Sequence, residues 1–562
     1  MSVRSRRRLV VLLALVAVVA VVALAASCGS SSGGGGGASA GASGSPKSGG
    51  TLNVSFQGEP TGLDPAVAWE VESWSIEHCL FNQLLSFKAA PGPAVVVPDI
   101  ASEVPTTENG GITNDGKTFT YHLRHGVMFQ PPVSREVTAD DFKYSIERML
   151  NPKLVPDAPA GYLYGAIKGV DAFTNGKAAH VSGIKVIDKY TLEIDLSQTN
   201  YVFNEVMALP FTAVVAKEWE DKYNSRTIKR HPLGTGPFVF KSWANGQSIV
   251  LAKNPGYFVS GFPHLDGIDF QFAACASTAV LQLQSGKIDV LGSGLPTADY
   301  VRMTNNPQWK SQVTTADQVA YYYVFMNVQV KPFDNKTVRQ AMNYAVNTAK
   351  IQKLLFGQAK ALNQVFPAGM PGHVDGTTFY TYDPQKAKDL LAQAGYPNGF
   401  KVTFYTHNVD PMPKLAASIQ NDLEAVGVKA DIKQLAEAPY WNLIERQASH
   451  VPIGLTDWFM DYPDPSDWID PLYSKASAQT DGSANVSWWW SPKVEELNKQ
   501  AQPMEPGDAR TKLYEQMQQV IMDEAPSVPL FQPIQTTMCS KTTGGFYTNA
   551  AFTFDFPSYW KQ

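Results

Sequence analysis

Residues 114–129 read NDGKTFTYHLRHGVMF, and residues 138–148 read TADDFKYSIER. In the first stretch apolar and polar side chains alternate from Phe119 to Leu123, which is the pattern of a half-buried strand. In the second stretch Thr138 can cap the free N–H groups of a helix, and the apolar residues that follow it share one helical face. A strand and a capped helix in close succession predict that this region mixes β and α structure.

Other stretches extend this pattern in both directions. Residues 238–251 predict a β-hairpin, because their central Asn-Gly pair tolerates the positive φ angles of a type I′ turn. Residues 383–395 predict a helix with Asp383 as its N-cap, proline at its first position and Gly395 at its end. The apolar positions of residues 415–426 also share a helical face. Helices and strands without a strict βαβ rhythm indicate α/β domains with mixed sheets that are discontinuous in sequence.

Length and composition set broad limits on the class of protein. The chain has 562 residues, of which 44% are hydrophobic and 11% aromatic. At about 150 residues per domain, this length predicts two to four globular units. The composition excludes a disordered or collagen-like chain. With 46 basic and 51 acidic residues and a net charge of −5, the charge balance gives no indication of nucleic-acid binding.

The amino terminus has the features of an export signal. A basic start precedes an uncharged run, Leu9–Ala26, that ends in small residues before Cys28. Residues 24–29 (LAASCG) resemble a bacterial lipobox, although Ala25 stands where leucine is commonest. This resemblance implies removal of residues 1–27 as a signal peptide and lipidation of Cys28. An uncleaved transmembrane helix is the alternative. In either case the sequence predicts a protein tethered to the outer face of the cell membrane.

A linker follows the predicted lipidation site. Residues 28–50 comprise Cys28 and a tract with 10 Gly, 7 Ser and 3 Ala, which cannot form a core. Such a tract behaves as a random coil with a reach of about 25 Å. It is expected to connect the lipid anchor to a folded body that begins near Thr51.

Eight blocks of the chain resemble one protein family, in the same order as in that family. They are residues 49–65 (GGTLNVSFQGEPTGLDP), 114–129, 138–148, 234–238 (GTGPF), 253–258 (KNPGYF), 285–289 (SGKID), 383–395 and 461–465 (DYPDP). The family is the oligopeptide/dipeptide/nickel-binding family (family 5) of solute-binding proteins of bacterial ABC importers. The similarity covers nearly all of residues 49–562. One departure, at residues 130–136 (QPPVSRE), concerns a local loop and leaves the fold intact.

The resemblance implies a fold and a function. The fold is α/β and two-lobed, like that of the periplasmic binding proteins (type II, with an extra domain), with mixed sheets and a hinge between the lobes. The implied domains are domain I (50–87, 200–272 and 528–562), domain II (88–199) and domain III (273–527). The implied function is capture of a small solute, above all a peptide, between the lobes and its delivery to the permease of an ABC importer. The protein is expected to be a monomer without a cofactor.

The resemblance also implies where a ligand binds. Asp461 corresponds to the aspartate that holds the α-amino group of bound peptides in this family, with Met460 in place of the usual alanine. In an open cleft this carboxylate is expected to be hydrated before the ligand arrives. The other implied ligand-binding residues are Trp458, Tyr462, Tyr321, Tyr322, Tyr323, Asn327, Trp69, Glu72, Ser73 and Trp74. From the residues alone, Asp461 can also belong to a proline-pinned surface loop, and the tyrosines to an apolar core strand.

The sequence contains no motif that points to catalysis or to a metal. The nine histidines form no H-E-x-x-H pattern, and no P-loop, dinucleotide-binding glycine motif or C-x-x-C occurs. We therefore predict no catalytic residue and no metal site. Three alternatives stay open: a bound oligosaccharide, favoured by the aromatic content, a bound nickel chelate, and a secreted hydrolase. Trp488–Trp490 can stack on a sugar ring or belong to the core.

Three cysteines remain beyond the predicted lipidation site. Cys79 lies in an apolar run and is expected to be a small buried residue. A bridge between Cys275 and Cys539 is conceivable in an oxidising exterior, since both lie near the expected hinge.

Overall fold

The computed structural model describes residue 41 and residues 44–562, with gaps at 155–157, 159, 224, 274, 479, 481 and 550–552. The expected signal peptide, Cys28 and most of the linker lie outside the described residues. Among the helices that are described, none is both long and apolar enough to span a bilayer. The elements below all belong to one compact unit, residues 37–562.

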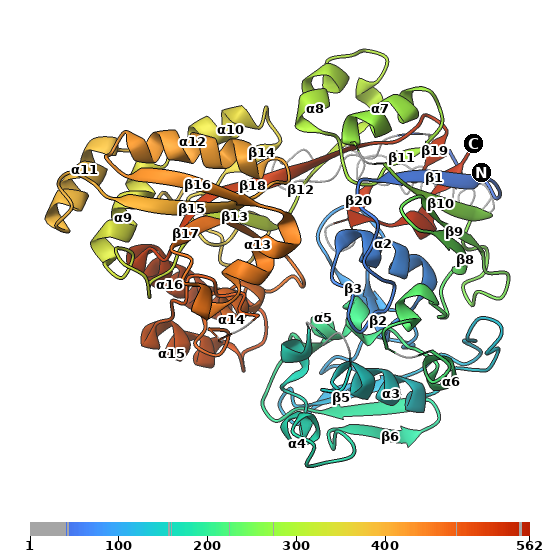
Figure 1. Cartoon of the computed structure of the whole chain (residues 1–562). Helices are drawn as coiled ribbons and strands as arrows, with labels where there is room; N and C mark the ends of the chain where they lie inside the picture. Colours follow the sequence, from blue (N-terminus) through green and yellow to red (C-terminus); the bar gives the residue numbers. More distant parts are fainter. Residues whose placement is uncertain are drawn as a thin grey trace, which may run out of the picture. The chain divides into compact units, whose positions relative to one another are not determined.

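The first sheet joins strands from distant parts of the chain. In spatial order its strands are β11 (Val290–Leu291), β1 (Thr51–Phe56), β10 (Gly267–Phe272), β9 (Ser248–Lys253) and β8 (Phe238–Ala244). β1 runs parallel to β10 and β11, whereas β9 is antiparallel to both β10 and β8, so the sheet is mixed (Figure 1). The sheet therefore confirms the expectation of mixed, sequence-discontinuous domains.

The predicted hairpin is present, but its turn differs from the predicted type. β8 and β9 pair up to Ala244 and Ser248, which leaves three residues in the loop. Gly246 has a φ of 65°, whereas Asn245 keeps a negative φ. A type I′ turn needs positive φ at both central residues, so that prediction was wrong. Three-residue hairpin loops need the left-handed conformation only at one position, which glycine occupies here without steric cost.

The second sheet contains the strand from which the sequence analysis began. Its antiparallel strands are, in order, β4 (Ile112–Thr113), β5 (Thr118–His122), β7 (Thr191–Asp195) and β6 (Ile184–Asp188). Phe119 and Tyr121 of β5 are fully buried, as the alternation predicted. Helix α3 (Ala139–Met149) follows with Thr138 at its N-cap, where the Asp141 carboxylate accepts a hydrogen bond from the Thr138 backbone N–H at 2.9 Å. Both sequence predictions are confirmed.

Short helices and strand pairs from residues 71–220 and 543–561 accompany these two sheets. The helices are α2 (Val71–Leu80), α4 (Val170–Thr174), α5 (Phe203–Met207) and α6 (Lys217–Glu220), with the 3-10 helix η1 at Gly161–Tyr164. The two-stranded pairs are β2 (Leu85–Phe87) with β3 (Val96–Pro98), β19 (Thr543–Gly544) with β22 (Trp560–Lys561), and β20 (Thr548–Asn549) with β21 (Thr553–Phe554). Lys561 Nζ donates to the Thr51 carbonyl oxygen at 3.1 Å, so the C-terminal end lies beside β1.

The third sheet is formed by strands that lie between residues 313 and 538. Its strands are β12 (Val313–Asp317), β18 (Ser527–Met538), β13 (Ala320–Met326), β17 (Ile453–Phe459), β15 (Lys401–His407) and β16 (Lys429–Leu435), and β14 (Ala359–Ala361) also pairs with β18. The helices around it are α9 (Lys336–Ala345), α10 (Thr348–Leu354), α11 (Pro384–Gln393), α12 (Met412–Glu424), α13 (Glu437–Ile444), α14 (Ser466–Tyr473), α15 (Pro492–Ala501) and α16 (Asp508–Glu524). Helices α7 (Ala276–Gln284) and α8 (Thr297–Thr304) precede the sheet in sequence.

Two strands cross the domain boundaries expected from the sequence. β18 was expected to begin domain I, yet it hydrogen-bonds along its length to β12, β13 and β14 of the third sheet (Figure 1). β11 was expected in domain III, yet it pairs with β1 of the first sheet. β11 and β18 therefore pair with strands of a different expected domain from the one to which the sequence assigned them.

Helix α11 begins and ends at the expected residues. The Asp383 side chain accepts from the Lys386 backbone N–H at 2.9 Å and begins α11, and Gly395 ends it with a φ of 92°. Leu415, Ile419 and Leu423 of α12 are buried.

The three described cysteines are all free, so the conceivable bridge between Cys275 and Cys539 is not formed. Cys79 is fully buried, as predicted.

Candidate functional site

A cavity of about 780 Å³ is lined by parts of the chain that are far apart in sequence. Its walls come from Trp69, from residues 158–166 around η1, from residues 198–206 leading into α5, and from residues 445–510. The last range includes Trp458 at the end of β17 and residues of α14 and α15. The volume lies inside the range of about 300–1,000 Å³ that is typical of small-ligand pockets. We treat this cavity as the candidate site.

Asp461, in the turn between β17 and α14, is not itself among the described lining residues, but it contacts one of them, Trp69. Its Oδ1 accepts a hydrogen bond from the indole Nε1 of Trp69 at 3.1 Å, and its backbone N–H donates to Oδ2 of Asp467 at 2.9 Å. Its side-chain neighbours Trp69 and Tyr462 both line the cavity. The Oδ2 atom of Asp461 is buried and accepts no hydrogen bond from any described residue. A buried carboxylate oxygen without a donor is unusual and needs an explanation.

The environment of Asp461 differs from the expected one. The residue is only 8% exposed, so the expectation of a hydrated carboxylate in an open cleft was wrong. Burial raises the pKa of Asp461 to about 7, against the smaller opposing effect of the Trp69 hydrogen bond. Burial, and then the charge of Asp461, also raises the pKa of Asp467 well above its usual value. Near neutral pH the Asp461 carboxyl is therefore partly protonated, and a nearby cation would favour its charged form.

A second group of acceptors lies on α14, α15 and the end of α13. Asp470 lines the cavity and its Oδ1 accepts from Nδ2 of Asn498 at 2.6 Å. Burial raises the pKa of Asp470 to about 6. Glu495 and Glu445 also line the cavity, and burial raises the pKa of Glu445 to about 7. The cavity wall is therefore rich in carboxylates.

Arg510, the basic residue of the described lining, is paired with the carboxylate of Asp464. Arg510, which is 3% exposed, makes a two-pronged contact with the Asp464 carboxylate through Nη1 and Nη2. It also donates through Nε to the Ala501 carbonyl oxygen at 3.0 Å and through Nη2 to the Tyr514 hydroxyl at 3.0 Å. Its charge is matched first by Asp464, although it also lowers the pKa of Asp470 in part, against the larger effect of burial.

The predicted tyrosine strand contributes to the core. Tyr321 is fully buried, contacts the Ser527 hydroxyl through its own at 2.8 Å and stacks on Tyr323 with ring centroids 4.2 Å apart. Tyr322 points to the opposite face of the sheet and stacks on Phe531 at 4.6 Å. None of these three rings belongs to the described lining of the cavity. The core-strand interpretation therefore describes them, because alternate side chains of β13 enter two different cores.

The remaining predicted residues divide in the same way. Of Trp69–Trp74, Trp69 lines the cavity, whereas the indole of Trp74 donates to the Ala68 carbonyl oxygen at 2.9 Å. Ser73 is buried and donates to the Gly62 carbonyl oxygen at 2.9 Å. Glu72 is half-buried and its pKa is raised, first by burial. Asn327 accepts from the Gln329 backbone N–H at 3.0 Å in the turn after β13. Trp69, Trp458 and Tyr462 are thus the predicted residues in the described lining.

Trp488–Trp490 belong mainly to the interior. Trp488 is 4% exposed and Trp489 is 6% exposed, and Trp489 packs edge-on against Tyr473 at 6.1 Å. Trp490 is exposed and carries the Lys475 ammonium 4.9 Å above its ring. The core interpretation therefore holds for the first two, and the three indoles do not form one stacking surface.

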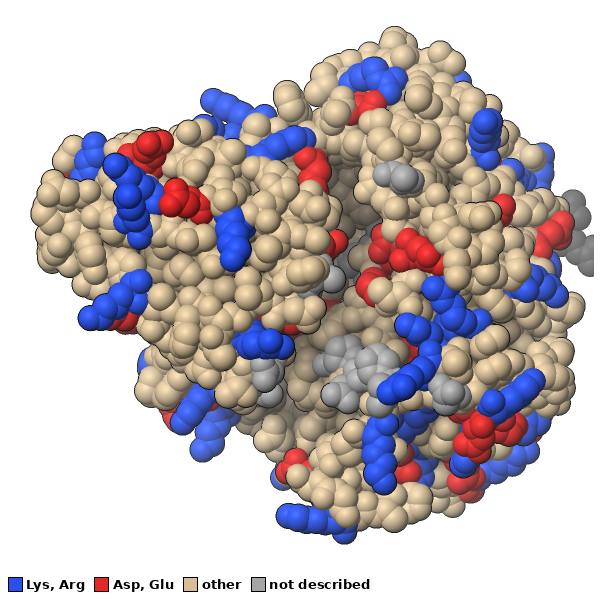
Figure 2. Space-filling model, viewed as in Figure 1, with Lys and Arg blue, Asp and Glu red and all other residues tan. Residues whose placement is uncertain are grey.

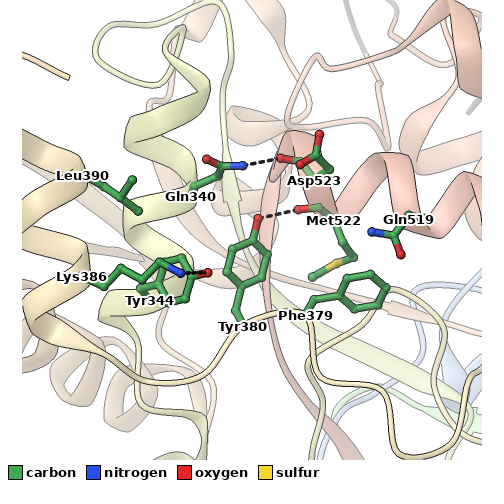
Figure 3. A pocket seen from close by; sticks show the side chains of 9 residues that line it. All are labelled: Gln340, Tyr344, Phe379, Tyr380, Lys386, Leu390, Gln519, Met522 and Asp523. Carbon is green, nitrogen blue, oxygen red and sulfur yellow. Dashed lines mark hydrogen bonds between the residues drawn. The ribbon is translucent and has the colours of Figure 1, made fainter. Parts of the chain in front are cut away.

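A smaller cavity of about 280 Å³ lies between α9, α11 and α16 (Figure 3). Its polar groups are engaged with one another: Tyr380 donates to the Met522 carbonyl oxygen at 2.7 Å, and Lys386 Nζ donates to the Tyr344 hydroxyl at 2.6 Å. No buried side-chain atom without a partner lies among its described lining residues. The larger cavity is lined by two residues with buried unpartnered polar atoms, Trp458 (Nε1) and Asn498 (Oδ1), and is therefore the better candidate site.

A family model matches more than half of the chain. The model of the bacterial extracellular solute-binding proteins, family 5, matches residues 95–480, well over half of the chain. The chain belongs to this family. The family is one of solute-binding proteins rather than of enzymes, and the matched range contains most of the cavity wall.

Relatives in this family match over almost their whole length. Heme-binding protein A of Haemophilus influenzae is 28% identical over 512 residues, which cover 88% of this chain and 89% of the relative. The dipeptide-binding protein of Escherichia coli is 29% identical over 507 residues, which cover 86% of this chain and 90% of the relative. Most of this chain and most of each relative are therefore covered by the similarity.

Solved structures of family 5 type share the fold. The ABC transporter-associated periplasmic binding protein DppA from Helicobacter pylori, in complex with the peptide STSA, has a TM-score of 0.80 at 26% identity and covers 92% of this chain and 98% of its own. Clavulanic acid biosynthesis oligopeptide binding protein 2 has a TM-score of 0.85 at 23% identity and covers 94% and 99%, respectively. The predicted fold class, an α/β periplasmic-binding-protein fold with mixed sheets, is confirmed.

Several residues of the site were not predicted from the sequence. Tyr162 and its neighbours in η1 line the cavity, but the sequence around them contains no recognisable motif. Asp467 and Asp470 lie three positions apart on α14, a spacing that puts both on one helical face and that could have been noticed beside Asp461. Asn498 could not have been found, because its role depends on the packing of α15 against α14.

Proposed function

We propose that this chain binds a peptide in the cavity beside Asp461 and delivers it to the permease of an ABC importer. The support from relatives is that one is named a dipeptide-binding protein and that a similar structure holds the peptide STSA. The support from this chain is the unpartnered Oδ2 of Asp461, a buried acceptor next to the cavity. This atom carries the proposal, because a peptide brings the donor that it lacks.

The chemistry of the site suits a peptide amino terminus. An α-ammonium group offers three N–H donors and a positive charge, and a charge-assisted hydrogen bond to a carboxylate is roughly twice as strong as a neutral one. The Asp461 carboxyl, with a pKa of about 7, gives up its proton readily when such a cation arrives. The rings of Trp69, Trp458 and Tyr462 line the cavity and offer apolar surface to the rest of the ligand.

The proposal places the protein outside the cytoplasm as a monomer. The anchor would be the lipid on Cys28, joined to the folded body by the Gly/Ser-rich residues 29–50. A leash of this composition lets the body reach the permease without fixing its orientation. Two or more acyl chains on the cysteine would be needed for lasting attachment, since one chain binds a membrane only marginally.

The test is a binding panel on the protein that begins at residue 28. Thermal unfolding would be recorded with di- to tetrapeptides of alanine, their N-acetyl forms, a maltose oligomer series and nickel–histidine. A free peptide at 100 times its Kd should stabilise the protein by about 2.7 kcal/mol, and acetylation of its amino terminus should remove most of that effect. Mass spectrometry should recover the peptide intact.

The opposite results would refute the proposal. Stabilisation by the sugar or nickel probes with no response to any peptide would show that another solute binds here. Loss of the peptide with appearance of its fragments would show that the protein is a hydrolase.

A further inference from the structure

The cavity has a second acceptor group that the proposed contact with Asp461 leaves unused. Asn498 of α15 is 7% exposed, lines the cavity and donates through Nδ2 to Asp470 of α14. Its Oδ1 atom is buried and accepts no hydrogen bond from any described residue. With Nδ2 fixed on Asp470, the amide presents its oxygen as a free acceptor, so a donor is missing here as well.

Carboxylates surround this free acceptor. Asp470 lines the cavity, and Glu495, one turn before Asn498 on α15, lines it too. The charge of Glu495 contributes to the raised pKa of Asp470, so the two groups are near enough to repel each other. Glu445 lines the cavity from the end of α13. Burial is the cause of its raised pKa.

The described lining contains one basic residue, Arg510, and this residue is paired with a carboxylate outside the group. Arg510 is engaged by Asp464 and by two further acceptors, as described above. Lys475 lies over the ring of Trp490 and is outside the described lining. Figure 2 shows both basic and acidic side chains spread over the face that it draws. In the described lining of the cavity, by contrast, the single basic residue Arg510 stands against Asp470, Glu495 and Glu445, so a ligand would have to supply further positive charge.

We infer that the cavity selects peptides with a cationic side chain, lysine or arginine, whose charged end binds Asp470, Asn498 and Glu495 while the amino terminus binds Asp461. The inference rests on the proposed peptide-binding function and names the class of peptide. A lysine ammonium can donate to Asn498 Oδ1 and to both carboxylates at once, and a guanidinium can do the same in a planar fork. A neutral side chain would leave the buried Oδ1 of Asn498 without a donor, while Asp470 would keep only its bond from Asn498 and Glu495 only its bond from the Lys475 backbone N–H. This unmet acceptor, beside two carboxyl groups, is the physical basis of the selectivity.

The test compares matched peptides that differ only in this charge. Tripeptides of alanine with one lysine at position 1, 2 or 3 would be titrated by calorimetry, each beside its Nε-acetyl-lysine counterpart. In the wild-type protein at least one lysine peptide should bind about tenfold or more tightly than its acetylated form. Raising the salt concentration should reduce that ratio only slightly, since a buried pair is poorly screened.

Two substitutions locate the effect. Asp470→Asn and Glu495→Gln should each bring the ratio down, to about threefold or less, while changing the affinity for the acetylated peptide little. Asp389→Asn removes an exposed carboxylate of α11 that accepts only from Gln385 among the contacts described, and should leave the ratio unchanged. Circular dichroism of each variant establishes that it is folded before the titration.

The outcomes separate this inference from the function on which it rests. Neutral and cationic peptides that bind equally well would overturn the cationic preference and leave the peptide-binding function standing. A preference that survives both substitutions would refute the assignment to Asp470 and Glu495. If no peptide of either series binds, the proposed function falls together with the inference.

Discussion

Peptide affinity should depend steeply on pH, because Asp461 has to lose a proton when the ligand arrives. In the free protein burial raises the pKa of this carboxyl to about 7. At pH 5 the free carboxyl is almost fully protonated and at pH 7 about half protonated, whereas the complex with an ammonium needs it charged. Binding therefore releases about one proton at pH 5 and about half a proton at pH 7, and the affinity should rise roughly 50-fold from pH 5 to pH 7.

The other groups around Asp461 do not reverse this sign. Burial, and then the charge of Asp461, raises the pKa of Asp467 on α14 well above its usual value, so ionisation of Asp461 favours the neutral form of Asp467. From η1, burial raises the pKa of Tyr162 and Tyr164 well above the usual value, so both hydroxyls stay neutral throughout. Above pH 7 the affinity should level off, and it should fall once the peptide amino group itself loses its proton near pH 8.

The assay is calorimetric titration of trialanine, whose side chains do not ionise, between pH 5 and 8. Repeating the pH 6 titration in two buffers of different ionisation enthalpy counts the released protons directly. In Asp461→Asn the slope should be small, and affinity at pH 7.5 should be about 30- to 1000-fold weaker, a loss of about 2–4 kcal/mol. Wild-type affinity that is constant from pH 5 to 7, or an equal slope in the variant, would refute the reasoning.

Three further predictions concern stability and attachment. The folded pKa of Asp461 lies above its unfolded value of 3.8, so its burial costs stability as pH rises from about 4 to about 7. Asp461→Asn should therefore raise the melting temperature of the free protein at pH 8, by the equivalent of at most roughly 4 kcal/mol. An unchanged or lower melting temperature would contradict this. Arg510→Met leaves Asp464 buried and unpaired and should cost about 3–5 kcal/mol in urea unfolding, part of which the double variant with Asp464→Asn should recover; additive losses would argue against the pair. Cys28→Ala should move the protein from the membrane fraction to the soluble one, whereas a variant that stays bound and unprocessed would show a permanent helical anchor.

Local structure was largely encoded in short stretches of sequence. The alternation around Phe119 and Tyr121 predicted β5, and Asp383 with the following proline predicted the start of α11, because strand and helix termini depend on neighbouring residues. The position of Asp461 was also accessible, through the resemblance of residues 461–465 to a family motif. The type of turn between β8 and β9 was not, since an Asn-Gly pair fits more than one hairpin loop.

The tertiary structure decided what surrounds these elements. Three neighbouring tyrosines read alike in sequence, but the pairing of β13 between β17 and β18 sends two of them into one core and the third into another. The contact between Trp69 and Asp461 joins residues 392 positions apart, and no local pattern predicts it. The burial that raises the pKa of Asp461, and the unpartnered oxygens of Asp461 and Asn498, exist only because separate segments enclose them and exclude water.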